Sequence, residues 1–140
     1  VQSSSDHEHS MVFDGMKWTE GPKITQCGHH PEHFTGKIVL QTGMPYFPGG
    51  SLIVFDGIHD ASKLSLAVWD FNISDDILYV LQSDNIIKCT NDLINWTTIA
   101  TAPKTARSLA VLDNQLYIGT TDSKIYVYED AIKIPPSSKH

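Results

Sequence analysis

The stretch DDILYVLQSDNIIKCTND at residues 75–92 recurs in altered form as DNQLYIGTTDSKIYVYED at residues 113–130. In this alignment Leu78 falls on Leu116, an offset of 38 residues. Both copies contain a short apolar run, a polar turn and a second apolar run, which is the pattern of a β-hairpin. The recurrence predicts a chain built from similar β-units rather than from one irregular sheet.

Other segments support the same repeat. The triplet IVL at residues 38–40 falls on LYV at residues 78–80, an offset of 40. The segment SLAVWD at 65–70 also matches SLAVLD at 108–113. We therefore expect a repeating unit of about 39 residues, within the range that is typical of repeat proteins.

Strand signals dominate the whole chain, whereas no window of a dozen residues keeps an uninterrupted helical apolar stripe. Short segments rich in Val, Ile, Leu, Thr and Tyr are separated by Gly, Asp, Asn, Ser and Pro. Nine strands are expected, at residues 36–43, 50–57, 63–70, 76–83, 85–90, 95–100, 107–113, 115–120 and 124–129. The fold class predicted from these segments is all-β.

Units of about 40–50 residues with four short strands each are typical of the blades of a β-propeller. The clearest blade has expected strands at 65–69, 77–82, 86–90 and 95–100. A second unit spans 107–134, a third spans 33–64 with an insertion at 44–50, and residues 11–25 resemble the outer strands of a fourth. Stacked blades are covered on both sides, so ILYVL at 77–81 and SLAVW at 65–69 are expected to be inner strands buried on both faces.

About three to four antiparallel units are too few for the 4–8 blades of a typical propeller. We therefore expect a partial ring, or a ring completed by oligomerisation or by the rest of a longer propeller chain. The predicted organisation is a flexible polar arm at 1–10, a repeat domain at 11–134 and a C-terminal tail at 135–140. The unpaired ends of such an array favour homo-oligomer or filament contacts.

Two short segments carry the same spacing of Asp and Trp, VFDGMKW at 12–18 and TNDLINW at 90–96. They resemble the Asp-box of Asp-box (BNR-type) β-propellers, through Asp14 and Trp18 in the first and Asp92 and Trp96 in the second. Their offset of 78 equals two repeat periods. The resemblance implies a structural role, in which the Asp holds a hairpin turn and the Trp packs between blades.

Two further segments repeat the Asp without a following Trp, at Asp56-Gly57 and at Asp130. The alternative resemblance is to WD-like repeat propellers. It rests on a Gly-His pair at 28–29, on Phe55-Asp56 and on Trp69-Asp70, which recur without a steady phase.

Composition excludes several functions. The net charge is −6, and only ten Lys and Arg residues are scattered along the chain, so neither nucleic acid nor an anionic membrane is an expected partner. No apolar run approaches the roughly 20 residues that span a bilayer. A module that is not an enzyme, needs no cofactor and serves binding or structural self-assembly is therefore expected.

The alternatives are a fragment of a glycoside hydrolase-type propeller enzyme and a glycan-binding lectin. Sialidases of the Asp-box family hold the substrate carboxylate with several arginines, whereas this chain has Arg107 alone. Other glycosidases need two facing carboxylates. The available residues, each expected at a turn, are Asp60, Asp70, Asp75, Asp76 and Asp84. A lectin site would use the loop aromatics Tyr46, Phe47 and Trp69.

The histidines gather in HEH at 7–9 and in GHHPEH at 28–33. His29, His30 and His33 are weak candidates for a metal site, because three converging imidazoles can bind Zn²⁺, Cu²⁺ or Ni²⁺. Pro31 predicts a loop there, so an exposed polar loop without metal is the favoured interpretation. A contact that responds to pH is a third alternative.

Two cysteines and two sequons bear on the compartment. Cys27 and Cys89 are either two buried thiols or one disulfide, since sequence alone does not bring their Cα atoms within bonding distance. Asn72 (NIS) and Asn95 (NWT) are possible glycosylation sites. Asn72 is expected in a loop and is the preferred acceptor. These features favour an extracellular, secreted glycoprotein.

Overall fold

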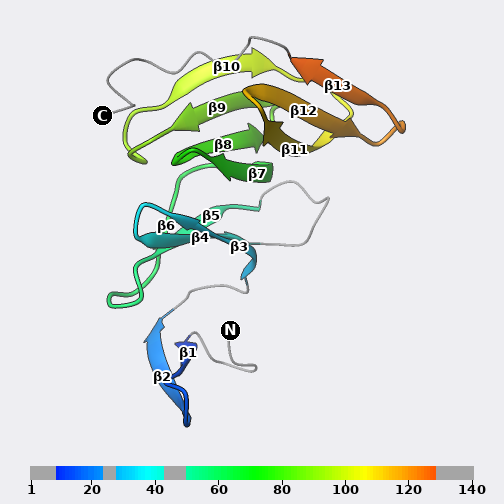
Figure 1. Cartoon of the computed structure of the whole chain (residues 1–140). Coiled ribbons are helices and arrows are strands. Elements are labelled where there is room, and N and C mark those ends of the chain that lie inside the picture. Colours follow the sequence, from blue (N-terminus) through cyan, green and yellow to red (C-terminus); the bar gives the residue numbers. More distant parts are fainter. Residues whose placement is uncertain (1–8, 24–27, 43–49, 129–140) are drawn as a thin grey trace. The chain divides into compact units, whose positions relative to one another are not determined.

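A computed structural model describes residues 9–23, 28–42 and 50–128 of the chain, and these residues form antiparallel β-structure (Figure 1). They separate into two compact units, the first containing β1–β6 and the second β7–β13. Among the described strands there are four sheets of two to four strands and no closed ring. The all-β prediction is therefore confirmed. The same residues include no helix with the length and hydrophobicity to cross a bilayer.

The first unit contains a two-stranded ribbon and a four-stranded sheet. The ribbon pairs β1 (His9–Phe13) with β2 (Trp18–Lys23). The sheet has the order β3-β4-β5-β6, formed by Gly28–Phe34, Lys37–Thr42, Leu52–Phe55 and Ser62–Lys63. β1 begins at His9, whereas a flexible arm was expected to extend to residue 10.

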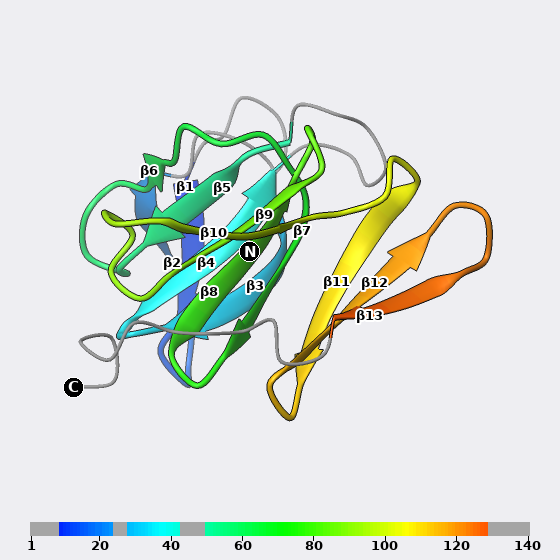
Figure 2. The same ribbon diagram turned by 90° about the horizontal axis from the view of Figure 1, so that it is seen from above.

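The second unit contains two sheets built from consecutive strands. The first has the order β10-β9-β8-β7, formed by Thr97–Thr101, Ile86–Thr90, Ile77–Gln82 and Val68–Ser74. The second has the order β11-β12-β13, formed by Ala106–Leu112, Gln115–Thr120 and Ile125–Tyr128. Figure 2 shows β11, β12 and β13 as a separate fan beside the first sheet, with β11 nearest to it.

The same hairpin turn opens three of the sheets. The first two strands are joined by Thr35-Gly36, Asp75-Asp76 or Asp113-Asn114, and all six residues have positive φ angles between 45° and 79°. Two-residue turns with both φ angles positive match the twist of paired strands, and Asp, Asn and Gly adopt this conformation most readily. The turns are separated by 40 and 38 residues, the offsets seen in the sequence.

The turns also show where the strand predictions were wrong. The first strand of the second unit spans 68–74, not 65–69, because the Asp75-Asp76 turn sets the pairing of Ser74 with Ile77. The match between SLAVWD and SLAVLD, at an offset of 43, therefore joins positions that are not structurally equivalent. The register shifts between Val68 and Asp70 and again between Ala106 and Ser108, at the offset of 38.

A second correction concerns GHHPEH, which was expected to be a loop. Residues 28–34 form β3, and its register shifts between His29 and Glu32. Pro31 lies within this irregularity, where a missing N–H does not interrupt a regular ladder. The three histidines proposed as metal ligands therefore belong to a strand.

Burial is deepest in the strand predicted to be covered on both faces. All five residues of Ile77–Leu81 are buried, and Leu78, Val80 and Leu81 are completely inaccessible. Because successive side chains point to opposite faces, both faces of β8 are shielded. SLAVW does not share this property, because Ser65 is exposed and only Val68 is fully buried.

The core of the second unit lies between its two sheets. It combines side chains of β8 and β9 with those of β11 and β12, and its buried members are Ile77, Tyr79, Leu81, Ile87, Cys89, Ala102, Ala106, Leu109, Leu116 and Ile118. Leu78 and Leu116, the landmarks of the repeat, are both fully buried.

Candidate functional site

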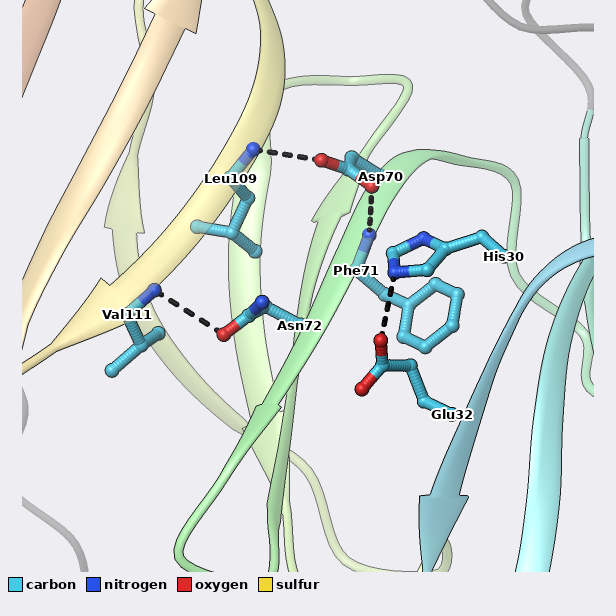
Figure 3. A network of polar contacts seen from close by, with 7 residues as sticks. All are labelled: His30, Glu32, Asp70, Phe71, Asn72, Leu109 and Val111. Atoms are coloured by element: carbon cyan, nitrogen blue, oxygen red, sulfur yellow. Dashed lines mark hydrogen bonds and ion pairs between the residues drawn. The ribbon is translucent and has the colours of Figure 1, made fainter.

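The junction between β7 and β11 is held by polar side chains rather than by a backbone ladder. The Leu109 N–H donates to Asp70 Oδ2 over 2.9 Å, and the Val111 N–H donates to Asn72 Oδ1 over 3.2 Å (Figure 3). Residues two apart on a strand point to the same side, so both acceptors of β7 face β11. Each bond joins residues 39 positions apart, which is one repeat period. We call these two bonds the β7–β11 latch.

A stacked pair of side chains lies beside the latch. The Arg107 guanidinium carbon lies 3.9 Å from the centroid of the Trp69 ring, a distance typical of a cation–π contact. One Arg107 nitrogen, Nη1, also donates to the carbonyl oxygens of Lys104 and Ala106. The chain's single arginine is therefore engaged within its own unit, and its partner Trp69 is one of the aromatics proposed for a lectin site.

The opposite side of the β11–β13 sheet forms an exposed apolar face. The register sets Ser108 opposite Gly119 and Gly119 opposite Ile125, so their side chains belong to one face. We call this surface the outer face; its residues are Ser108, Ala110, Leu112, Gln115, Tyr117, Gly119, Ile125 and Val127.

Most of the large apolar side chains of the outer face are accessible. Leu112 is 60% exposed, Ile125 74% and Val127 44%. Tyr117 is half-buried, and its hydroxyl donates to Gln115 Oε1 over 2.8 Å. None of the eight residues is charged. An uncharged, exposed sheet face in a chain of net charge −6 is a candidate contact surface.

Three aspartates form the same turn at the ends of strands. Oδ1 of Asp14, Asp56 and Asp92 accepts the backbone N–H groups of the residues two and three positions later, over 2.7–3.0 Å. These bonds stabilise the charged carboxylate and lower the pKa of Asp14 and of Asp92, whose largest contributions come from backbone amides. The aspartates serve the turn, as a side chain that mimics a backbone turn does.

The tryptophans of the two Asp-box segments differ in burial. Trp18 is 58% exposed, and its ring lies against Phe13 with a centroid separation of 5.1 Å. Trp96 is half-buried. The expected interior wedge therefore does not describe Trp18, which shares an exposed ribbon with Phe13. In the Asp92 turn, the Thr90 hydroxyl adds bonds to the carboxylate and to the Leu93 N–H.

The Asp56 turn contains a charged pair that the sequence gave no reason to expect. His59 Nδ1 lies 2.8 Å from Asp56 Oδ2, and this contact raises the pKa of His59. The same hydrogen bond is the largest cause of the lowered pKa of Asp56. An Asp followed three residues later by His in a turn is the signal that would have identified it.

The candidate histidine ligands do not converge. His30 Nε2 lies 3.2 Å from Glu32 Oε2, and His33 Nε2 accepts the Gly36 N–H over 3.3 Å (Figure 3 shows the first pair). The side chain of His29 lies outside the described residues. In the part of the chain that the structure describes, no group of three or more potential ligands is positioned to hold a metal ion.

The carboxylates proposed for catalysis have local structural roles. Asp60 accepts the Lys23 N–H and Asp84 the Ile86 N–H. Asp75 and Asp76 form a hairpin turn. Asp70 was expected at a turn but lies within β7, where it forms the latch. Sequence reasoning missed this role; the signal was a pair of polar residues two apart in an otherwise apolar strand.

The two sequons lie in different environments. Asn72 lies in β7 and is half-buried, so the prediction that it occupies a loop was wrong. Asn95 is exposed in the Asp92 turn.

Cys89 is a buried free thiol, and burial raises its pKa. Cys27 lies outside the described residues, as do Tyr46, Phe47 and Asp130, and the Cys27–Cys89 disulfide stays a prediction.

Comparison with known proteins finds no family that matches this chain and no curated protein that matches it.

Proposed function

We propose that this chain is a non-catalytic, extracellular module of the β-propeller type that serves structural self-assembly. The observation that carries the proposal is the β7–β11 latch. Asp70 and Asn72 join the first strands of two successive antiparallel sheets at an offset of one repeat. Sheets stacked through their first strands, each a meander of consecutive strands, are the arrangement that propeller blades require.

The outer face of β11–β13 is the repeat equivalent of an interface already formed within the second unit. At the offset of 38, Ser108 corresponds to Asp70 and Ala110 to Asn72. On β7 these positions contact the next strand, β11. On β11 the same side is exposed and lacks the two long acceptors, so a partner there would bind through apolar contact instead.

A second copy of this chain is the proposed partner. A net charge of −6 opposes self-association through most surfaces, because like charges would be brought together. The uncharged outer face avoids this repulsion, and two such faces can pack as sheets do, about 10 Å apart. A symmetric contact between identical faces is the commonest form of self-association.

The contact should be weak in isolation. Three strands about 4.8 Å apart, with about 3.3 Å per residue, present a few hundred Å². A standard interface buries about 800 Å² on each partner. We therefore expect association that depends strongly on protein concentration.

Sedimentation velocity across a wide range of concentrations tests this proposal. Ile125→Lys, at 74% exposure on the outer face, should shift the protein to the monomer. Ile58→Lys, at 76% exposure on an Asp turn of the first unit, is the matched control and should leave the association unchanged. A protein that stays monomeric at all concentrations, or equal effects of the two variants, would contradict self-association through this face.

A further inference from the structure

We infer that Asn95 is an N-glycan acceptor and that Asn72 is not. Both residues begin an Asn-x-Ser/Thr sequon, so the sequence alone makes them equivalent. They differ in exposure, in secondary structure and in what their amide groups already bind. The inference does not depend on the proposed self-assembly.

Asn95 lies where a glycan can be accommodated. The side chain is exposed in the turn that joins β9 to β10, and Thr97, the hydroxyl residue of the sequon, is exposed at the first position of β10. The backbone of the turn is held by the Ile94 and Asn95 N–H groups, which both donate to Asp92 Oδ1 over 2.8 Å. The turn is thus defined by bonds that a glycan on the side chain leaves in place.

The chemistry of attachment is compatible with the observed side-chain bond. Asn95 Nδ2 donates to Asp92 Oδ2 over 2.9 Å and carries two hydrogens. Transfer from an oligosaccharide carried on a lipid diphosphate forms a bond between Nδ2 and the anomeric carbon. One Nδ2 proton is lost, the lipid diphosphate leaves, and no oxidation is involved. The remaining N–H can still donate to the Asp92 carboxylate.

The neighbours of Asn95 also favour a covering sugar. Ile94 is 79% exposed, and Trp96 on the other side is half-buried. A glycan between them would shield apolar surface from water. The corresponding positions of the other two Asp turns are Lys17 and His59, so neither of those turns carries a sequon at this place.

Asn72 has the opposite environment. It is half-buried within β7, and its Oδ1 accepts the Val111 N–H over 3.2 Å. Its side chain points toward β11, the first strand of the adjacent sheet. A glycan on Asn72 would have to fit between β7 and β11 and would separate the two strands that the latch joins.

The test is to secrete the full chain from a eukaryotic cell behind a cleavable signal peptide and to map its glycans by peptide mass spectrometry. Treatment with peptide N-glycosidase should release one glycan and convert Asn95 to Asp. Thr97→Ala removes the hydroxyl of one sequon and should abolish the glycan. Ser74→Ala removes that of the other, leaves Asn72 in place for the latch, and should change nothing.

A folded, secreted protein without glycan at Asn95 would overturn the inference. A glycan on Asn72 in the folded protein would overturn it as well. Asn95→Gln provides a second variant of the acceptor itself, and circular dichroism of each secreted variant establishes that loss of the glycan is not loss of the fold. None of these results changes with the oligomeric state, so failure here and failure of self-assembly are distinguishable.

Discussion

Replacing Asp70 with Ala should weaken the contact between the two sheets of the second unit. The Leu109 N–H would lose its acceptor, and Leu109 is buried, with 5% of its surface exposed. A buried amide left without a partner costs about 1–3 kcal/mol. The Phe71 N–H, which donates to Asp70 Oδ1 over 2.9 Å, would lose the same side chain. We expect the free energy of unfolding to fall by about 2 kcal/mol.

The effect should be visible at one amide. If opening of the junction limits exchange, a loss of about 2 kcal/mol accelerates hydrogen exchange of the Leu109 N–H about 30-fold. Urea unfolding followed by circular dichroism measures the stability, and NMR measures the exchange. Asp70→Asn retains a side-chain oxygen as acceptor, so its losses should be smaller than those of Asp70→Ala.

Asp84→Ala is the matched control, because Asp84 also accepts one backbone N–H, that of Ile86, but in an exposed turn of the same unit. It should leave exchange at Leu109 unaffected. Unchanged exchange at Leu109 in Asp70→Ala would refute the view that the latch holds β11 to β7. So would equal acceleration in the Asp84 control, since the effect would then be global.

Leu78→Ala removes a completely buried side chain and should lower the free energy of unfolding by about 2–5 kcal/mol, whereas Ile94→Ala at an exposed tip should change it by less than about 0.5 kcal/mol; urea denaturation compares them, and equal losses would contradict the assigned core. The Asp92 pKa lies below its ordinary value of 3.8, so the turn is stabilised above that pH and loses this contribution as pH falls through the folded pKa; a carboxyl titration by NMR with a midpoint at or above 3.8 would argue against the hydrogen bonds described. The His59 pKa is raised above 6.5, so its contribution is present below that pH and is lost as pH rises through the folded pKa; Asp56→Asn should return the imidazole titration toward 6.5, and an unshifted titration would exclude the pair.

Much of the second unit could be predicted because its signals are local. The run Ile77–Leu81 is apolar throughout, and such a run between turn residues indicates a strand covered on both faces. The pairs Asp75-Asp76 and Asp113-Asn114 favour the positive φ angles of tight hairpins. The Asp14 and Asp92 turns are local as well, since each aspartate binds amides two and three residues away.

The errors occurred where polar residues lie in strands. β3 contains two histidines, a proline and a glutamate, and β7 contains Asp70 and Asn72, so both resemble loops by composition. Their strand conformation depends on pairing with β4 and β8, which supply hydrogen bonds that no local pattern reveals. Propensity is a weak guide when a neighbouring strand decides the conformation.

The sequence by itself determined that this chain is all-β, that its hairpins recur at offsets of 38 and 40, and that the strand containing Leu78 is buried. These properties follow from side-chain alternation and turn chemistry, which act over a few residues. Only the tertiary structure decided that Asp70 and Asn72 are acceptors at a junction, that the outer face of β11–β13 is exposed, and that Asn95 rather than Asn72 is accessible. The physical reason is that a hydrogen-bond partner 39 residues away, or the lack of a covering sheet, depends on how separate strands meet in space.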